Sequence, residues 1–251
     1  MKLNIQNKVV LITGGTGGIG EQIVADFLDE NALVVCLIRS REKFNETKKS
    51  INDQGISVAN LHYDICDLNN YKTIKASVNN IAREHGRIDI LVNCAGFTPE
   101  VPFALLESEQ ISSIVDLNLT SPMYVCHAVL RHMFIQKEGS IINISSVSSV
   151  KKGRGVVAYA SAKAGLENFT RTLSQEVGKR NIRVNCVRPG VVATTMSEAL
   201  LSRSIEMIKE DTALGRPGKP NEISKAVLFL ASNSASSYMS GECIAIDGGL
   251  Y

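Results

Sequence analysis

The chain has 251 residues, of which 44% are hydrophobic and 21% charged, and its 27 basic and 25 acidic side chains leave a formal charge of +2. This length and composition predict one large soluble domain with a sizeable core. The balanced charge excludes the basic stripe of a nucleic-acid-binding protein, and no apolar run approaches the roughly 20 residues that a membrane span requires. We therefore expect a cytoplasmic protein whose partners include neither nucleic acid nor membrane.

The six cysteines are far apart in the sequence and form no CxxC pair. Most of them lie inside apolar runs, which favours buried, reduced thiols over disulfides. No histidine accompanies them at metal-ligand spacing, so the sequence predicts no metal site.

Short β-branched runs alternate with helical patterns along the whole chain. In order, they are a strand at 9–13, a helix at 19–29, a strand at 33–38, a charged helix ending near 54, a strand at 57–62, a helix at 68–85, a strand at 88–92, one long or two abutting helices at 109–134 interrupted by Pro122, a strand at 140–144, a helix at 158–178, a strand at 182–187, a helix at 222–230 and a strand at 243–246. The alternation predicts an α/β fold over residues 1–251: a single doubly wound Rossmann-type domain with a mainly parallel seven-stranded sheet. Residues 189–220 form a segment longer than an ordinary connection between two elements, and we expect them to form a helical substrate lid.

A glycine-rich turn joins the first predicted strand to the first helix. It fits GxGxxG at Gly15, Gly17 and Gly20, and also TGxxxGxG from Thr13. Glycine permits the close backbone approach that a pyrophosphate needs, and the helix N-terminus supplies free N–H groups. The position of the motif in the first βαβ unit therefore predicts a dinucleotide site, whereas the alternative is a glycine turn that binds nothing. The residues of this predicted site are Gly14, Gly15, Thr16, Gly17, Gly18, Ile19 and Gly20.

The end of the second strand distinguishes the two nicotinamide cofactors. An acidic residue there accepts a hydrogen bond from the ribose 2′-hydroxyl of NAD, whereas an arginine suits the 2′-phosphate of NADP. Ile38 stands where the acidic residue would be, and Arg39 follows it. We therefore expect NADP(H), with Arg39 at the phosphate; the alternative is that Arg39 and Arg41 are only solvated.

Tyr159 and Lys163 are four residues apart at the start of the helix predicted for 158–178, so they share one helix face. An ammonium group one turn from a phenol favours the phenolate and lowers the phenol pKa toward neutrality. Such a tyrosine can donate a proton to a carbonyl that is being reduced. A surface tyrosine and lysine on an amphipathic helix would show the same spacing, so the other motifs decide between the two interpretations.

Together these motifs resemble the short-chain dehydrogenase/reductase family, and the resemblance covers essentially the whole chain. It rests on TGxxxGxG at 13–20, Asn93-Cys94-Ala95-Gly96, Asn118, Ser146, Tyr159-x-x-x-Lys163 and Pro189-Gly190. The C-terminal motifs are similar to those of 3-oxoacyl-[acyl-carrier-protein] reductases: Gly215-Arg216-Pro217, Asn221-Glu222-Ile223 and Asp247-Gly248-Gly249.

The resemblance implies four catalytic residues. Ser146, rather than its neighbour Ser145, would hydrogen-bond the substrate carbonyl and stabilise the developing oxyanion. Tyr159 would be the general acid, so Ser146 and Tyr159 would both contact the substrate. Lys163 would bind the nicotinamide ribose and lower the Tyr159 pKa, and Asn118 would hold a water that links Lys163 to solvent.

The resemblance also implies further contacts with the cofactor. Asp64 and Ile65 would bracket the adenine, and Asn93 would meet the adenosine ribose. Val192 and Thr194 would contact the nicotinamide end. The remaining implied cofactor residues are Ala95, Gly96, Tyr159, Lys163, Pro189 and Gly190.

By the same resemblance we expect NADPH-dependent reduction of a 3-oxoacyl group, carried on acyl carrier protein, in fatty acid synthesis by a homotetramer. The lid would offer the substrate an apolar face, or pack that face on the core or on a neighbouring subunit; its residues are Met196, Leu200, Leu201, Ile205, Met207 and Ile208. The alternative is a related enzyme acting on a sugar, polyol or other small keto or hydroxy compound. A cofactor-binding protein without turnover is disfavoured because all four catalytic residues are present.

Overall fold

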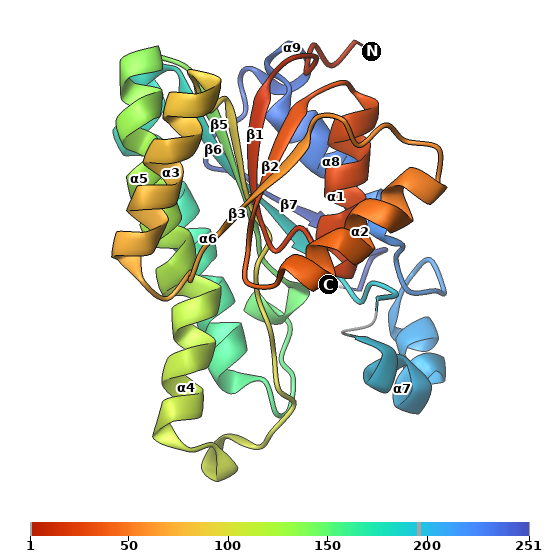
Figure 1. Ribbon diagram of the computed structural model, residues 1–251. Coiled ribbons are helices and arrows are strands. Elements are labelled where there is room, and N and C mark those ends of the chain that lie inside the picture. The colour runs from red at the N-terminus through yellow and green to blue at the C-terminus, as the bar shows by residue number, and fades with distance from the viewer. Residues whose placement is uncertain (1, 195–196, 251) are drawn as a thin grey trace.

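The computed structural model of the chain describes residues 2–194 and 197–250. Within them, seven parallel strands form one sheet in the order β3-β2-β1-β4-β5-β6-β7 (Figure 1). The strands are β1 Val9–Thr13, β2 Leu33–Ile38, β3 Leu61–Ile65, β4 Ile90–Asn93, β5 Gly139–Ile144, β6 Ile182–Pro189 and β7 Cys243–Ile246. The strand order reverses between β1 and β4, and in such sheets ligands bind in the crevice at the carboxyl ends of the strands there.

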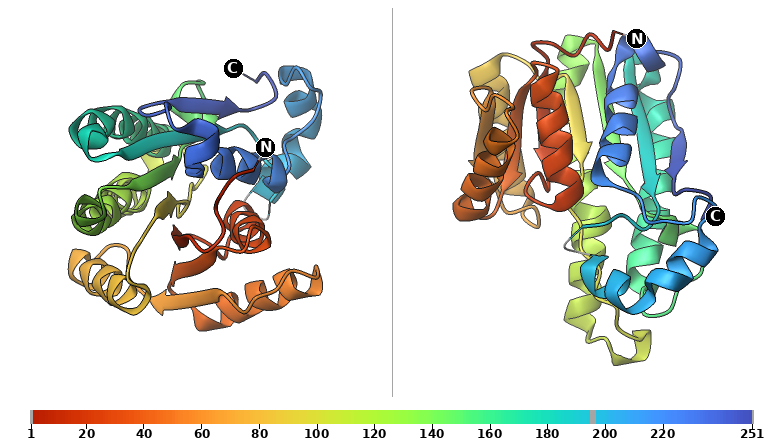
Figure 2. Two further views of the ribbon diagram at one scale, coloured as in Figure 1. Left: turned by 90° about the horizontal axis from the view of Figure 1, so that it is seen from above. Right: turned by 90° about the vertical axis from the view of Figure 1, so that its right-hand side faces the viewer.

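Helices cover both faces of this sheet (Figures 1 and 2). One face carries α1 Gly18–Asp29, α2 Arg41–Asp53 and α8 Pro220–Ala231; the other carries α3 Tyr71–His85, α5 Ser121–Gln136 and α6 Val157–Val177. Successive side chains of a strand point to opposite faces. Val10 and Ile12 therefore pack with the first group of helices and Leu11 with the second, which explains why strands with two buried faces are continuously apolar.

Two helices extend beyond the carboxyl ends of the strands, on opposite sides of the sheet (Figure 1). They are α4 Ser108–Val115 and α7 Glu198–Asp211, and the last helix, α9 Asn233–Ser236, lies near the N-terminus. The α7 helix falls inside the segment 189–220 that we predicted to be a lid. Its backbone departs from helical geometry at Ser204.

The predicted doubly wound sheet is confirmed, but one strand lies elsewhere than predicted. Residues 57–62 were expected to form the third strand, whereas Ala59 and Asn60 form a turn and β3 begins at Leu61. β3 pairs only with β2, from Val34↔Leu61 to Ile38↔Ile65. An edge strand is buried on fewer sides, so it tolerates polar residues and shows little of the apolar pattern that identifies a central strand.

The helical pattern predicted for 109–134 is two helices separated by a π-helical turn, Asp116–Thr120. Pro122 lies in the first turn of α5, where its missing N–H leaves no hydrogen bond unmade. The π turn contains Asn118, which is fully buried. Turns of this kind are frequent at functional sites.

The structure shows which apolar residues of α6 and α7 lie in the core and which are exposed. Leu166 and Leu173 are buried in the core, and Phe169 packs partly against it. On α7, Ile208 is 5% exposed and Met207 is 56% exposed, so these neighbours face opposite environments. Met196 and the side chain of Leu200 lie outside the described residues.

Most cysteines were expected to be buried because they lie inside apolar runs. Four are buried, whereas Cys94 and Cys243 are half-buried. In the described ranges, no helix combines the length and apolar character needed to span a bilayer.

Candidate active site

The glycine-rich loop packs against the segment that follows β4. Gly14 has a φ of +71°, and a Cβ at this position would lie 2.6 Å from the backbone nitrogen of Ala95. A Cβ on Gly20 would lie 2.0 Å from the Gly14 carbonyl oxygen. The Ala95 N–H donates to Thr13 Oγ1 at 3.2 Å, which joins the two loops. Only glycine therefore permits this close approach of backbone to backbone at positions 14 and 20.

The start of α1 is available to an anion. Gly17 is the N-cap residue and provides no side-chain hydrogen bond, and Gly17 and Gly18 are exposed. A Cβ on Gly18 would lie 2.8 Å from Cγ2 of Thr194, so the segment after β6 meets the glycine loop here. Uncapped N–H groups beside a narrow glycine surface fit the pyrophosphate of a dinucleotide.

Arg39, Asp64 and Ile65 lie together at the carboxyl ends of β2 and β3, because Ile38 and Ile65 are register partners. Ile38 is buried, whereas Arg39 is exposed and forms no ion pair with any residue that the structure describes. Ile65 is 60% exposed, an unusual position for a large apolar side chain. An apolar surface beside an unpaired arginine fits an adenine and a 2′-phosphate.

The side chain of Asn93, which we expect to meet the adenosine ribose, lies in the interior between β4, β5 and α5. It is 2% exposed, and its Nδ2 donates to Asn143 Oδ1 at 2.9 Å and to Cys126 Sγ at 3.3 Å. These bonds fix β4 to β5 and α5 in the interior. The Asn93 Oδ1 is buried and accepts no hydrogen bond from the described residues, and its contact with the ribose stays a prediction.

Ser146, Tyr159 and Lys163 come together at the carboxyl end of β5. Ser146 lies near enough to Tyr159 for its hydroxyl to lower the pKa of the Tyr159 phenol. Lys163 Nζ lies 5.7 Å from the centroid of the Tyr159 ring and donates to the Ile144 carbonyl at 2.7 Å. Ser145 instead donates to Glu167 at 2.9 Å. The structure therefore places Ser146, and not Ser145, beside Tyr159.

Asn118 faces Lys163 across the small space above Gly96. Its Nδ2 donates to the carbonyls of Phe97 and Ile114, at 2.8 and 2.9 Å. Its Oδ1 is buried and accepts no hydrogen bond from the described residues. A Cβ on Gly96 would lie 2.7 Å from this Oδ1 and 3.4 Å from Lys163 Nζ. An unpaired acceptor this near an ammonium group fits a bridging donor such as water.

Burial controls the protonation of the catalytic pair. It lowers the pKa of Lys163 to about 8. It raises the pKa of Tyr159, and the hydrogen bond from Ser146 opposes this only in part. This result differs from the expected lowering of the Tyr159 pKa by Lys163, because desolvation of the phenolate is the larger effect. A phenol that stays protonated near neutrality is the form that a proton donor requires.

The segment after β6 is held between two other parts of the chain. A Cβ on Gly190 would lie 2.8 Å from the Cα of Asp247. Val192 is 5% exposed and forms a bridge to Gly218, and its carbonyl accepts from Ser197 Oγ. Pro189, Gly190, Val192 and Thr194 thus line one path from the end of β6 to the glycine loop, where the nicotinamide half of a dinucleotide would extend.

The sequence analysis missed two charged residues behind this site, Glu167 on α6 and Arg188 on β6. Glu167 is 3% exposed, and Arg188 donates to it through Nε at 2.8 Å and Nη2 at 2.6 Å. Little signal for either residue was present in the sequence, because Glu167 is followed by the exposed Asn168 and β6 also contains Arg183 and Asn185.

A glycine loop on a parallel sheet, with a serine, a tyrosine and a lysine at its carboxyl edge, defines an oxidoreductase that uses a nicotinamide cofactor. A family model described as "Enoyl-(Acyl carrier protein) reductase" matches residues 14–251. The chain belongs to the short-chain dehydrogenase/reductase family.

Within this family the chain is similar to 3-oxoacyl-[acyl-carrier-protein] reductase FabG of Chlamydia trachomatis, with 38% identity over 245 residues and 97% of each chain covered. It is 36% identical over 246 residues to an acetoacetyl-CoA reductase of Acinetobacter, with 98% of each covered. Among solved structures, a gluconate 5-dehydrogenase from Burkholderia cenocepacia J2315 in complex with NADP and tartrate has a TM-score of 0.92 at 28% identity. The alignment covers 99% of this chain and 97% of that one.

The lowered pKa of Lys163 predicts a specific dependence of stability on pH. The Lys163 pKa is about 8 in the folded chain, against an ordinary value of 10.5. Between these values the unfolded chain binds the additional proton, so the free energy of unfolding rises with pH. Relative to Lys163→Met, the wild-type protein should gain about 2 kcal/mol between pH 8 and pH 10, measured by urea unfolding. The control is Lys179→Met, at an exposed position. This variant keeps Lys163, so its stability should rise with pH as in the wild type, and the wild type should show no gain relative to it; equal slopes for all three proteins would contradict the prediction.

Proposed function

We propose that this protein reduces a 3-oxoacyl thioester to the 3-hydroxyacyl form with NADPH. The observation that carries the proposal is the meeting of Ser146, Tyr159 and the buried ammonium of Lys163 at the carboxyl end of β5. Two relatives have names that specify a 3-oxoacyl thioester as the substrate, one on acyl carrier protein and one on coenzyme A. Both support the same substrate class.

The two hydroxyls have complementary parts in this reaction. As a carbonyl is reduced, negative charge develops on its oxygen, and donors already oriented toward that oxygen stabilise the charge. Ser146 Oγ and the Tyr159 hydroxyl would both donate to that oxygen. Tyr159 then transfers its proton to the oxygen, since an alkoxide is a much stronger base than a phenolate. Its raised pKa keeps that proton in place until the charge develops.

Lys163 and Asn118 would restore the proton on Tyr159. Lys163 titrates near pH 8, so it can give and regain a proton near neutrality. The unpaired Oδ1 of Asn118 would hold a water next to it. Lys163 and the water at Asn118 would connect the buried Tyr159 phenol to solvent.

NADP(H) would lie along the glycine loop, with its 2′-phosphate at Arg39 and its nicotinamide near Val192 and Thr194. When bound, the cofactor supplies the hydride. Buried Ile38 offers no carboxylate to the ribose of NAD, whereas Arg39 offers a free guanidinium to a phosphate.

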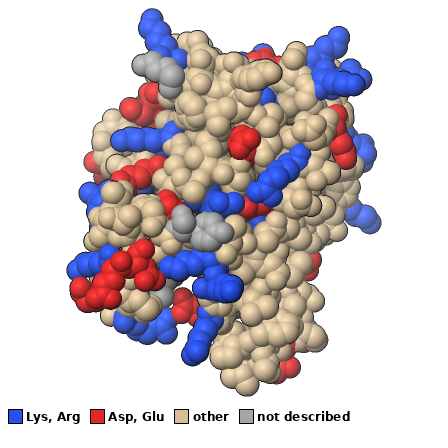
Figure 3. All heavy atoms as spheres, turned by 180° about the vertical axis from the view of Figure 1, so that it is seen from behind, with Lys and Arg blue, Asp and Glu red and all other residues tan. Residues whose placement is uncertain are grey.

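We propose an acyl-carrier-protein thioester as the carried substrate, in fatty acid synthesis. On the face seen in Figure 3, Lys and Arg side chains gather along the hollow between the two lower lobes of the molecule. Exposed Lys152 and Arg154 lie in the loop between Ser146 and Tyr159, and Lys151 pairs with Asp211 of α7 at 3.0 Å. Exposed cations in the loop between Ser146 and Tyr159 suit the phosphate of a thioester arm.

A second candidate function is oxidation or reduction of a small sugar acid or polyol. The gluconate 5-dehydrogenase structure, with its bound tartrate, favours this alternative. The same cations would then bind the carboxylate of the small substrate.

Turnover distinguishes the two functions. With acetoacetyl thioester, the protein should oxidise NADPH, followed by its absorbance, and Tyr159→Phe should lose at least 100-fold in kcat while binding NADPH as before. The phenylalanine keeps the ring and removes only the proton donor. Turnover of gluconate-type substrates alone would favour the second function, and full activity of Tyr159→Phe would exclude the assigned proton donor.

The cofactor preference is testable at two positions. Ile38→Asp combined with Arg39→Ala introduces an acceptor for the 2′-hydroxyl and removes the cation at the 2′-phosphate. The ratio of kcat/KM for NADPH to that for NADH should fall at least 100-fold, because one charge–phosphate pair is lost and one like-charge repulsion is added. The control is Arg41→Ala, which should change the ratio less than threefold. An unchanged ratio in the double variant would mean that other residues bind the phosphate.

We also propose a cytoplasmic homotetramer. The support is the set of large apolar side chains exposed on α5, which a neighbouring copy would bury: Met123 41%, Tyr124 37%, Phe134 41% and Ile135 82%. Sedimentation equilibrium of the wild-type protein should give four times the 27.2 kDa chain mass, and a monomer at micromolar concentration would contradict the proposal.

A further inference from the structure

One buried carboxylate behind the catalytic residues accepts hydrogen bonds from several parts of the chain. Glu167 lies one helical turn after Lys163 on α6 and is 3% exposed. Its donors are Ser149 Oγ at 2.5 Å, Arg188 Nη2 at 2.6 Å, Arg188 Nε at 2.8 Å, Ser145 Oγ at 2.9 Å and Arg171 Nη2 at 3.5 Å. So many hydrogen bonds to one carboxylate hold it in a single orientation.

These donors come from the two segments that flank Ser146 and from the strand that leads to the nicotinamide end. Ser145 immediately precedes Ser146, and Ser149 ends the short 3-10 turn that follows it, Val147–Ser149. Arg188 is the next-to-last residue of β6, directly before Pro189. Glu167 thus joins the serine segment, the helix of Tyr159 and Lys163, and the start of the cofactor segment.

The carboxylate is ionised over the range in which the enzyme would work. Burial raises the pKa of Glu167, but the hydrogen bonds from Arg188, Ser149 and Ser145 outweigh it and hold the pKa at about 2. Buried ion pairs of this kind contribute little net stability, because desolvation offsets their attraction. Their directional hydrogen bonds nevertheless define one geometry. A pair placed among three catalytic segments is therefore suited to orientation.

We propose that Glu167 and Arg188 are positioning residues for carbonyl reduction: the carboxylate holds residues 145–149 in the turn that presents Ser146 Oγ to Tyr159, and Arg188 aligns the cofactor segment with that turn. The proposal rests on the proposed function, because Ser146 and Tyr159 act on a substrate carbonyl. Neither Glu167 nor Arg188 contacts the substrate in this account.

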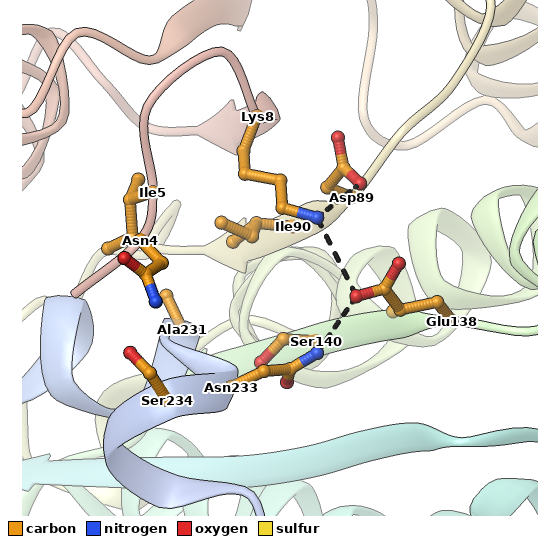
Figure 4. Close-up of a pocket in the computed structure, with 11 residues that line it drawn as sticks. Asn4, Ile5, Lys8, Asp89, Ile90, Glu138, Ser140, Ala231, Asn233 and Ser234 are labelled. Carbon is orange, nitrogen blue, oxygen red and sulfur yellow. Dashed lines mark hydrogen bonds and ion pairs between the residues drawn. The ribbon is translucent and has the colours of Figure 1, made fainter.

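Glu167→Gln tests the proposal, with Asp89→Asn as its matched control. The glutamine keeps the shape, but it removes the charge and offers Arg188 one good acceptor in place of two. Asp89 is likewise buried, 4% exposed, and pairs with Lys8 and Arg87. It lies beside a cavity of about 210 Å³ at the amino ends of β1, β4 and β5, the opposite edge of the sheet (Figure 4). Both substitutions should lower Tm.

Only Glu167→Gln should change the chemistry. Its kcat should fall at least tenfold while the KM for NADPH stays within threefold, and the isotope effect with NADPH deuterated at the transferred position should rise, because a misplaced Ser146 slows hydride transfer itself. Asp89→Asn should keep kcat within twofold. Wild-type kcat in Glu167→Gln, or an equal loss in Asp89→Asn, would overturn the proposal.

A double replacement separates orientation from stability. Glu167→Leu with Arg188→Leu removes both charges and leaves no buried charge unpaired, so Tm should recover relative to Glu167→Gln. Because Ser145 and Ser149 still lack their acceptor, kcat should remain low. Recovery of kcat together with Tm would show that the pair serves stability alone. If Glu167→Gln does not fold, Ser145→Ala removes one donor and should lower kcat at least threefold; unchanged kcat in that variant would overturn the proposal.

Crystal structures keep this test independent of the substrate. If the wild-type protein does not reduce acetoacetyl thioester, the proposed function fails but the orientation of Ser146 can still be observed. The distance between Ser146 Oγ and the Tyr159 hydroxyl should be the same in wild type and in Asp89→Asn and should lengthen in Glu167→Gln. An unchanged distance in Glu167→Gln would contradict the positioning role, whatever the substrate.

Discussion

The parallel alignment of the strands is the constraint on which the site depends. Parallel strands bring all their carboxyl ends to one edge of the sheet, so positions as distant as Gly18 and Thr194 meet there. The contact of Gly14 with Ala95 joins the loops on the two sides of the strand-order reversal. A side chain at Gly14 would separate them. The dinucleotide crevice is thus a consequence of strand direction and of one glycine that permits backbone contact.

Burial then determines the chemistry at that edge. Lys163 is a buried cation, and among the described residues no carboxylate pairs with it, although Glu167 lies one turn away. Arg188 engages that carboxylate, so Lys163 donates to the Ile144 carbonyl and keeps a lowered pKa. A direct pair with Glu167 would stabilise the ammonium form and remove its ability to exchange a proton near neutrality. The position of Arg188 therefore affects Lys163 without any contact between them.

Tyr159 illustrates why local spacing and local environment must be considered together. Its spacing from Lys163 indicates an acid–base pair, and the expectation was a lowered phenol pKa. In the folded chain the phenol is desolvated, and this effect exceeds that of the nearby hydrogen bond. The proton donor is consequently held in its protonated form, which suits reduction. Proton return then depends on Lys163 and on the unpaired oxygen of Asn118.

The sequence by itself determined the features that depend on short-range order. β1, β2 and β7 occupy the predicted residues, and α1, α6 and α8 begin and end within two residues of prediction, because apolar periodicity and turn residues are local properties. The glycine loop and the Tyr159–Lys163 spacing were likewise readable, since each motif lies within one element or one turn.

Only the tertiary structure decided what depends on neighbours distant in sequence. The edge strand β3 and the interior position of the Asn93 amide follow from pairing and packing that no local pattern encodes. Glu167 and Arg188 are 21 residues apart, on a helix and a strand, so their pairing is visible only in the folded chain. Desolvation, which depends on the whole surrounding fold, turns them into a pair and sets the protonation of Lys163 and Tyr159.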